Sequence, residues 1–272
     1  MKTSFVGLLI SVGCLLAPGP CSSLPAQVHV RFQLKDRVIT LHEPVVLLFK
    51  VHNASAQETV LDLGFSKIEF FHFSLTKPQG LTVRNEPPYT EGFGPSGKVV
   101  ISAGGDYEQL LVLNQWFRFD STGQYSLTAQ LNTRTHLNGT DNVDPEPEYI
   151  PFEIKERTPE RLTKICSDLA EQVKLAPNAQ VAQEPALLLS YVEDPIAVPY
   201  LSQLLGAHKL VEGSAVSALE RIGSEDAVKV LISALTSGYG DAPSLARQAL
   251  GMILKKTPDP SVKEIIREAG IR

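Results

Sequence analysis

Residues 194–238, DPIAVPYLSQLLGAHKLVEGSAVSALERIGSEDAVKVLISALTSG, decide how the second half of the chain folds. The segment repeats itself at an offset of 31 residues, so that Leu201 falls over Ile232 and Leu219 falls over Leu250. Each repeat contains two stretches with apolar residues at helical spacing. A period near 30 that carries two helices indicates stacked helical hairpins, each burying its apolar face against its neighbours.

Helical periodicity begins at Thr158-Pro159-Glu160. Thr158 is a favoured capping residue, proline is tolerated at the first helical position, and Glu160 meets the positive end of the helix dipole. The pattern predicts seven helices, at Pro159–Leu175, Ala179–Val192, Pro195–Leu205, Val211–Ile222, Glu225–Thr236, Ser244–Lys256 and Ser261–Glu268.

The same repeats resemble HEAT repeats of the short type first associated with phycobilin lyases. The resemblance covers about residues 180–272 and rests on an Asp-Pro or Glu-Asp cap, an apolar first helix and an Ala-rich second helix ending near Gly223. It implies a surface that binds a protein partner. Hydroxylases of the wider repeat class use His-Glu pairs on their helices, whereas the helical half here has one histidine, His208. We therefore do not expect hydroxylase activity. A lyase role is not expected either, because an exported protein would not meet the cytoplasmic substrate of these lyases.

The chain before Thr158 has the alternating pattern of β-strands separated by turn residues. Residues 45–51, VVLLFKV, are a nearly continuous apolar run, which predicts a central strand. The pattern predicts strands at Val28–Lys35, Val45–Val51, Thr59–Leu63, Ile68–Leu75, Leu81–Arg84, Val99–Ser102, Gln109–Phe119, Gly123–Asn132 and Tyr149–Lys155.

Two segments of this first half resemble immunoglobulin-like domains. Residues 119–127, FDSTGQYSL, resemble the corner in which a tyrosine bonds back to the upstream backbone, with Leu127 where the second cysteine would stand. Residues 41–64, LHEPVVLLFKVHNASAQETVLDLG, resemble the start of exported bacterial immunoglobulin-like modules and of the intracellular proteinase inhibitor family. These are fold motifs, and they imply a sandwich.

The expected fold class is therefore multidomain, all-β plus all-α: an antiparallel immunoglobulin-like β-sandwich followed by a short α-solenoid of HEAT-like hairpins. We place a signal peptide at residues 1–23, the sandwich at 24–157 and the repeats at 158–272. The signal peptide is indicated by Lys2, the apolar core Phe5–Leu16 and the helix-breaking residues Pro18 to Pro20. Pro20 precedes Cys21, where a lipidated cysteine requires a small non-proline residue, so we do not expect a lipoprotein.

Charge and apolar content limit the function classes. The net charge is −5, and neither half has the basic excess that nucleic-acid binding requires. No segment after the signal peptide has the run of apolar residues that a membrane helix requires. We therefore expect an extracytoplasmic protein, periplasmic or secreted, without a membrane span after cleavage and without a nucleic-acid partner.

No cofactor is expected from the sequence. Asp141, Asp144 and Glu146 crowd one loop, and such oxygen ligands can hold Ca²⁺, but their spacing differs from the EF-hand and a solvated loop explains them as well. The histidines at 29, 42, 52, 72 and 136 lack the short spacing of zinc motifs. Cys166 lies on a helical pattern, where a lone cysteine is usually a small buried apolar residue.

No catalytic motif is present, so the sequence predicts a protein that is not an enzyme and that binds a protein partner through its repeats. The candidate contact residues lie in two connections between helices: His208, Lys209, Tyr239 and Asp241. The alternative is a protease inhibitor that acts through the loop of residues 85–97, NEPPYTEGFGPSG, with Tyr89 and Phe93 as the presented aromatics. For both sets of residues, the alternative that they lie in ordinary solvated turns stays open.

Overall fold

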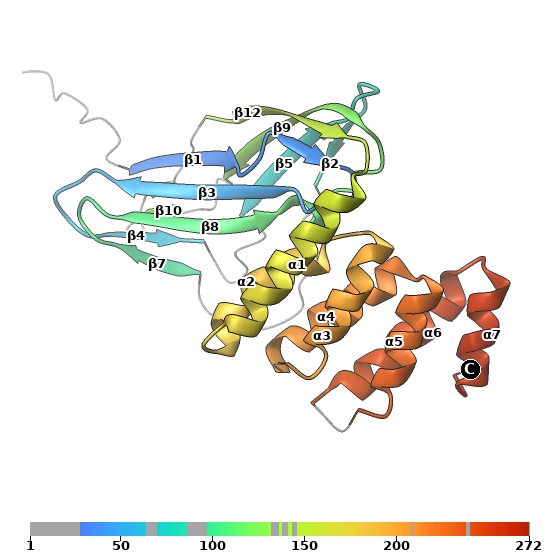
Figure 1. The fold of residues 1–272 in the computed structure, drawn as a ribbon. Coiled ribbons are helices and arrows are strands. Elements are labelled where there is room, and N and C mark those ends of the chain that lie inside the picture. The colour runs from blue at the N-terminus through green and yellow to red at the C-terminus, as the bar shows by residue number, and fades with distance from the viewer. Residues whose placement is uncertain are drawn as a thin grey trace, which may run out of the picture.

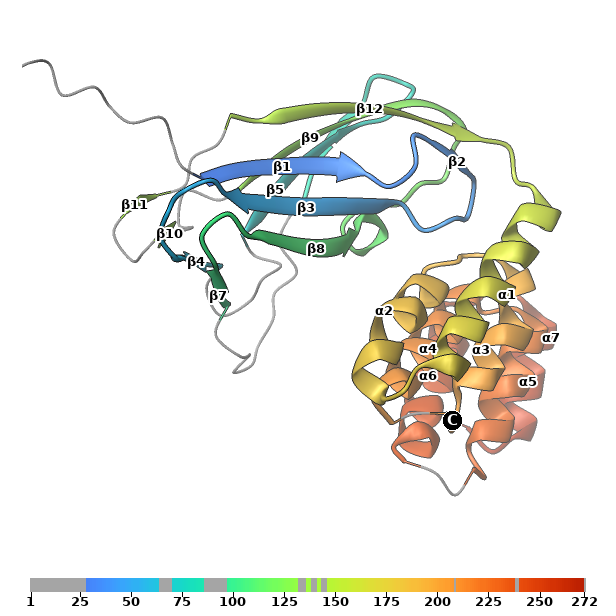
Figure 2. The ribbon, with the colours of Figure 1, turned by 60° about the vertical axis from the view of Figure 1, so that its left-hand side comes forward.

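A computed structural model describes residues 28–63, 70–85, 97–131, 136–137, 141–142, 146–207, 209–237 and 240–271. Strands occupy the first part of the chain and helices the second (Figure 1). The helices lie beneath one end of the sheets, and the last strand leads directly into the first helix (Figure 2). We refer to residues up to 157 as the sheet half and to later residues as the helical half.

Among the described residues of the sheet half, the strands form three small sheets. One has the order β1-β3-β8, a second β11-β10-β4-β7, and a third β2-β12-β9-β5-β6. The strands are β1 (Val28–Leu34), β2 (Val38–Thr40), β3 (Val46–Asn53), β4 (Thr59–Asp62), β5 (Phe71–Thr76), β6 (Thr82–Arg84), β7 (Lys98–Ile101), β8 (Asp106–Val112), β9 (Gly123–Leu131), β10 (His136–Leu137), β11 (Asp141–Asn142) and β12 (Glu148–Lys155).

The helices pack in two short layers. α2, α4 and α6 contact one another in sequence and form one layer, while α1, α3, α5 and α7 form the other. They are α1 (Pro159–Leu175), α2 (Ala179–Ser190), α3 (Val198–Leu204), α4 (Lys209–Ile222), α5 (Glu225–Ala234), α6 (Ala242–Lys256) and α7 (Pro260–Glu268). Their bounds agree closely with the ranges that the apolar spacing predicts.

Local sequence explains where several helices begin and end. The Asn178 side chain accepts a hydrogen bond from the Val181 amide at 3.0 Å, and α2 begins there. Gly223 ends α4 with a φ of 58°, a left-handed conformation that favours glycine. Thr158 differs from its expected role, because its hydroxyl donates to the Glu156 carbonyl at 3.4 Å and makes no capping bond to α1.

The first half of strand β3, from Val46 to Phe49, is covered on both faces, which explains the apolar run in its sequence. Leu47 and Phe49 point into the core of the sheet half. Val46 belongs instead to the hydrophobic cluster of the helices, as does Val112 of the neighbouring strand β8. Leu48 and Leu110 pack against the same cluster. The sheet half and the helical half therefore share one continuous apolar contact.

The expected fold class is wrong. The sheets are small and one is mixed, because β2 pairs in parallel with β12 through Val38 to Thr40 and Glu153 to Lys155. In the described part of the helical half, the helices form two short layers and no long solenoid. Since Val46 and Val112 lie in the helical cluster, strands and helices are parts of one mixed α/β arrangement and not an all-β module followed by an all-α module.

The strand expected at Gln109–Phe119 is also shorter than predicted. β8 ends at Val112 and the chain makes a 3-10 turn at Leu113–Gln115. The Asn114 side chain in this turn accepts a hydrogen bond from the Val45 amide at 2.7 Å. A side-chain bond to a backbone 69 residues away leaves no local signal in the sequence. The tyrosine of the corner does bond upstream: the Tyr125 hydroxyl donates to the Ser121 carbonyl at 2.8 Å.

We predict that Val112→Ala destabilises both halves together, by about 1 to 3 kcal/mol, because it removes buried methyl groups from the shared contact. Denaturant unfolding followed by Trp116 fluorescence reports on the sheet half, and far-UV circular dichroism reports mainly on the helices. The two transitions should coincide and shift together. Val100→Ala, at an exposed position, is the matched control. Separate transitions in the wild-type chain would contradict a shared core.

Candidate functional site

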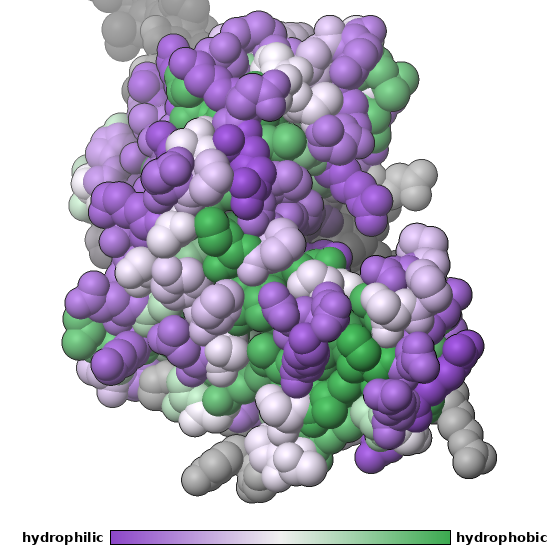
Figure 3. All heavy atoms as spheres, turned by 45° about the vertical axis from the view of Figure 1, so that its right-hand side comes forward, coloured by the Kyte–Doolittle hydropathy of each residue, from purple (hydrophilic) through white to green (hydrophobic). Residues whose placement is uncertain are grey.

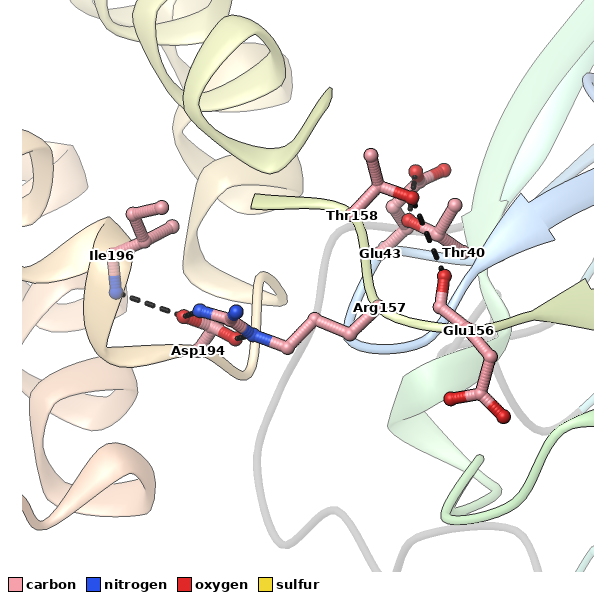
Figure 4. Close-up of polar contacts among 7 residues, drawn as sticks. All are labelled: Thr40, Glu43, Glu156, Arg157, Thr158, Asp194 and Ile196. Atoms are coloured by element: carbon pink, nitrogen blue, oxygen red, sulfur yellow. Dashed lines mark hydrogen bonds and ion pairs between the residues drawn. The ribbon is translucent and has the colours of Figure 1, made fainter. Parts of the chain in front are cut away.

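The junction between the halves contains a buried carboxylate from the helical half. Asp194 follows α2, and its side chain is only 2 % exposed. The Arg157 guanidinium, at the end of the sheet half, donates to both of its carboxylate oxygens, at 2.5 and 2.9 Å (Figure 4). The Ile196 amide donates to the same carboxylate at 3.0 Å. Arg157 lowers the pKa of Asp194, so this carboxylate is charged at neutral pH.

A second ion pair crosses the junction, this time with the carboxylate in the sheet half and the arginine in the helical half. Glu43 of the sheet half is 5 % exposed, and Arg161 of α1 donates to both of its carboxylate oxygens. Thr40 donates to Glu43 at 2.5 Å (Figure 4). His42 has a φ of 75°, and its carbonyl accepts from the Glu193 amide at 3.1 Å. Two bidentate pairs and a backbone bond thus hold the halves in one orientation.

A cleft of about 600 Å³ lies beside these contacts and has walls from both halves. Asn114, Arg118, Phe119 and Asp120 line it from the sheet half, together with His42. The ends of α4 and α6 line it from the helical half. The helical lining comprises Glu193, Pro195, Glu220, Arg221, Ile222, Gly223, Ile253, Lys256 and Thr257. This volume lies in the range of ligand sites in proteins.

The space-filling view shows the setting of the cleft. Polar side chains cover most of the sheet half, apolar side chains gather on the helical half, and the surface is hollowed where the halves meet (Figure 3). The surface at the junction is therefore a concave boundary between a polar and a more apolar region. Concave surfaces with a few fixed polar groups are typical binding sites.

Arg221 is the most firmly held cation in the cleft. Its Nη2 donates to the Ser190 carbonyl at 2.6 Å, and its guanidinium lies 4.6 Å from the centre of the Tyr191 ring. The carbonyl and the ring fix the guanidinium, and neither carries a formal charge that would neutralise it. Arg221 therefore presents a positive charge at a fixed place in the cleft wall.

Two acidic residues of the cleft already have cationic neighbours. Lys77 lies 3.1 Å from Asp120 and lowers the pKa of that carboxyl through its hydrogen bond. Lys256 lies 3.4 Å from Glu220. The described lining of the cleft has three cations, Arg118, Arg221 and Lys256, and three carboxylates, Asp120, Glu193 and Glu220, so its formal charges balance.

The contact residues expected from the sequence lie away from this cleft. Lys209 begins α4 and Asp241 precedes α6, whereas the cleft is at the opposite ends of these helices. Asp241 is exposed. His208 and Tyr239, as well as Tyr89 and Phe93 of the alternative loop, lie outside the described residues. The signal peptide expected at residues 1–23 also lies outside them.

The expected Ca²⁺ loop is only partly described. Asp141 lies in β11, Glu146 is exposed, and Asp144 lies outside the described residues. His29 and His52 stack across strands at 6.4 Å between ring centres, and His52 bonds to Asp106 at 2.9 Å. In the described part of the chain, no group of three or more acidic, histidine or cysteine side chains is arranged to hold a metal ion.

Cys166 is fully buried within α1. Burial raises the pKa of its thiol to about 12. A thiolate is the reactive form of cysteine, so this residue is a poor nucleophile at neutral pH. The structure places it in the apolar cluster of the helices, in agreement with the sequence interpretation.

Sequence reasoning missed the junction pairs and the cleft. Glu43 and Arg161 are separated by 118 residues, and Arg157 and Asp194 by 37. The available signal was weak: each carboxylate directly precedes a proline, in Glu43-Pro44 and Asp194-Pro195, and each arginine lies near the change from strand to helix. A single sequence does not indicate which of its charged residues meet over such separations.

No protein-family model matches the chain, and no curated protein matches its sequence. Three partly similar solved structures are the alkylpurine DNA glycosylase AlkC of Pseudomonas fluorescens bound to DNA containing an abasic site analog (14 % identity, 48 % of this chain, 31 % of that chain, TM-score 0.24), a β-glucosidase from Listeria innocua (13 %, 48 %, 16 %, 0.25) and the sporulation control protein Spo0M from Bacillus subtilis (13 %, 53 %, 56 %, 0.27). The chain spans less than two thirds of each. Such likenesses carry no argument about function.

Within the described ranges, no helix is long and apolar enough to cross a membrane.

We predict that Asp194→Asn weakens the dependence of stability on acid pH. Arg157 holds the pKa of Asp194 below its ordinary value of 3.8, so the pair stabilises the fold fully above that value and loses this contribution as pH falls through the lower, folded-state pKa. The drop in melting temperature between about pH 6 and about pH 3 should be smaller in the variant than in the wild type. Asp120→Asn, at an exposed pair, should change this drop less. An unchanged drop in Asp194→Asn would contradict the role of the pair.

We predict that Cys166 does not react with a thiol reagent in the folded protein. A chain that begins at residue 24 contains Cys166 as its only cysteine. Reaction with a disulfide reagent at about pH 8 should be negligible until denaturant exposes the thiol, because burial excludes the reagent and suppresses the thiolate. Ser217→Cys, at an exposed position of α4, supplies a reactive control. Rapid labelling of Cys166 in the native state would restore it as a candidate nucleophile.

Proposed function

We propose that this protein is a non-catalytic extracytoplasmic binding protein that holds a protein partner with its helical half. The contact surface is the cleft end of α4 and α6, where the helices face the sheet half. The observation that carries this proposal is the cleft itself, about 600 Å³ with one wall from each half. A concave site of that size with fixed polar groups supports recognition of a ligand.

The rigidity of the junction supports the same function. The pairs Arg157–Asp194 and Arg161–Glu43 fix the two walls relative to each other before any partner arrives. A pre-formed site loses less conformational entropy on binding than a mobile one. The resemblance of residues 180–272 to HEAT repeats, which commonly bind proteins, points in the same direction, and the extracytoplasmic location rests on the N-terminal sequence.

The experiment is a cross-linking pull-down from the native extracytoplasmic fraction with the whole chain from residue 24 as bait. The bait is the whole chain because the halves share an apolar contact. We expect one specific protein to be enriched and then to bind the purified bait directly. Lys256→Glu reverses a charge on the helical wall of the cleft and should reduce recovery by roughly tenfold, since it places repulsion at the interface.

Lys229→Glu is the matched control, because Lys229 lies in the other helix layer and is similarly exposed. Equal recovery with Lys256→Glu and wild type would move the contact surface away from the cleft. Recovery of proteases alone, lost when Tyr89 and Phe93 are both changed to alanine, would replace this proposal with the inhibitor alternative. Recovery of no specific protein would overturn the binding function.

A further inference from the structure

We infer that the cleft takes an extended acidic segment of the protein partner, with a carboxylate held between Arg118 of the sheet half and Arg221 of the helical half. This inference rests on the proposed function and specifies its ligand. Both guanidinium groups line the same cleft, from opposite walls. A planar guanidinium matches a carboxylate with two parallel hydrogen bonds, and clusters of arginine recognise acidic motifs in this way.

The charge of Arg221 is available for such a ligand. Its described contacts are the Ser190 carbonyl and the Tyr191 ring, which orient the guanidinium without neutralising it. Arg118 is exposed, and the described residues provide no ion pair for it. In contrast, Lys77 and Lys256 have carboxylate neighbours in Asp120 and Glu220. Among the cations that line the cleft, Arg118 and Arg221 therefore have no ion pair in the described part of the chain, and Arg118 interacts with Asp120 only at longer range.

The remaining lining suits a polypeptide better than a compact anion. Phe119, Ile222 and Ile253 offer apolar contact, and Asn114 and Thr257 offer hydrogen-bonding groups for a peptide backbone. The carboxylate of Glu193 also lines the cleft and would repel a ligand that carries many negative charges. The whole chain also carries a net charge of −5, which disfavours polyanions at long range. A segment with one or two carboxylates and intervening small residues satisfies these conditions.

The probe is a fluorescein-labelled hexapeptide of alternating glutamate and alanine, blocked at both ends and titrated against the whole chain from residue 24. A peptide with glutamine in place of glutamate is its matched control. We expect the glutamate peptide to bind more tightly by at least about tenfold and to weaken as salt is raised, because a charge-assisted bond is screened. Fluorescence anisotropy measures both effects.

Three variants locate the binding site. Arg118→Ala should weaken the affinity for the glutamate peptide by about tenfold. Arg221→Lys should weaken this affinity several-fold, because lysine keeps the positive charge but cannot donate the two parallel hydrogen bonds of a guanidinium. Arg247→Ala removes an exposed arginine of α6 outside the cleft lining and should leave affinity unchanged. Equal binding of the two peptides, binding of neither, or an equal effect of Arg247→Ala would overturn the inference.

The outcomes separate this inference from the proposed function. A partner that is captured by the wild type, lost with Lys256→Glu and retained with Arg118→Ala would preserve partner binding and refute the acidic segment. Failure to capture any partner would refute the proposed function itself. A phosphoserine peptide that binds more than about tenfold more tightly than the glutamate peptide would overturn the inference that the ligand group is a carboxylate. It would identify phosphate as the ligand group instead.

Discussion

The arrangement of the molecule depends on the burial of the outer face of β3 and β8 against the helices. A strand in a two-sided sheet normally alternates apolar and polar residues, because one face meets water. β3 departs from this rule over Val46 to Phe49, since Leu47 and Phe49 enter the sheet core while Val46 and Leu48 meet the helical cluster. Without the helices, this face would expose a row of branched apolar side chains. The helical half therefore covers an apolar face of the sheet half that would otherwise be exposed to water.

The ion pairs at the junction add specificity to that contact. Removing a carboxylate from water costs several kcal/mol, and only a well-placed cation offsets the cost. Glu43 and Asp194 are both almost fully buried, each with a bidentate arginine from across the junction. Any other orientation of the halves would leave two buried charges unpaired. The apolar contact thus supplies attraction, and the pairs select one orientation from those that apolar contact alone would permit.

Much of the local structure could be predicted from the sequence, because its causes are local. The positions of the helices follow from apolar spacing, and capping at Asn178 and termination at Gly223 follow from the chemistry of single residues. β2 and its parallel pairing could not be predicted. The strand has three residues, too few for periodicity to show, and its partner lies more than 100 residues further along the chain.

The candidate site shows the same limit. The sequence predicted contact residues at the N-terminal ends of α4 and α6, at Lys209 and Asp241, whereas the cleft is at the C-terminal ends of these helices. The sequence gives no reason to prefer the C-terminal ends, because the second wall of the cleft comes from residues 114–120, which lie in a different part of the chain.

The two ends of α4 and α6 differ in what they offer a partner. α4 has 14 residues, so its ends lie about 20 Å apart. At the N-terminal ends, Lys209 is the first residue of α4 and the exposed Asp241 directly precedes α6. At the C-terminal ends, Arg221 is already held by Ser190 and Tyr191, and the junction pairs already fix the opposing wall. Because association must overcome the entropy of every group that it orders, the groups already held at the C-terminal ends favour binding there.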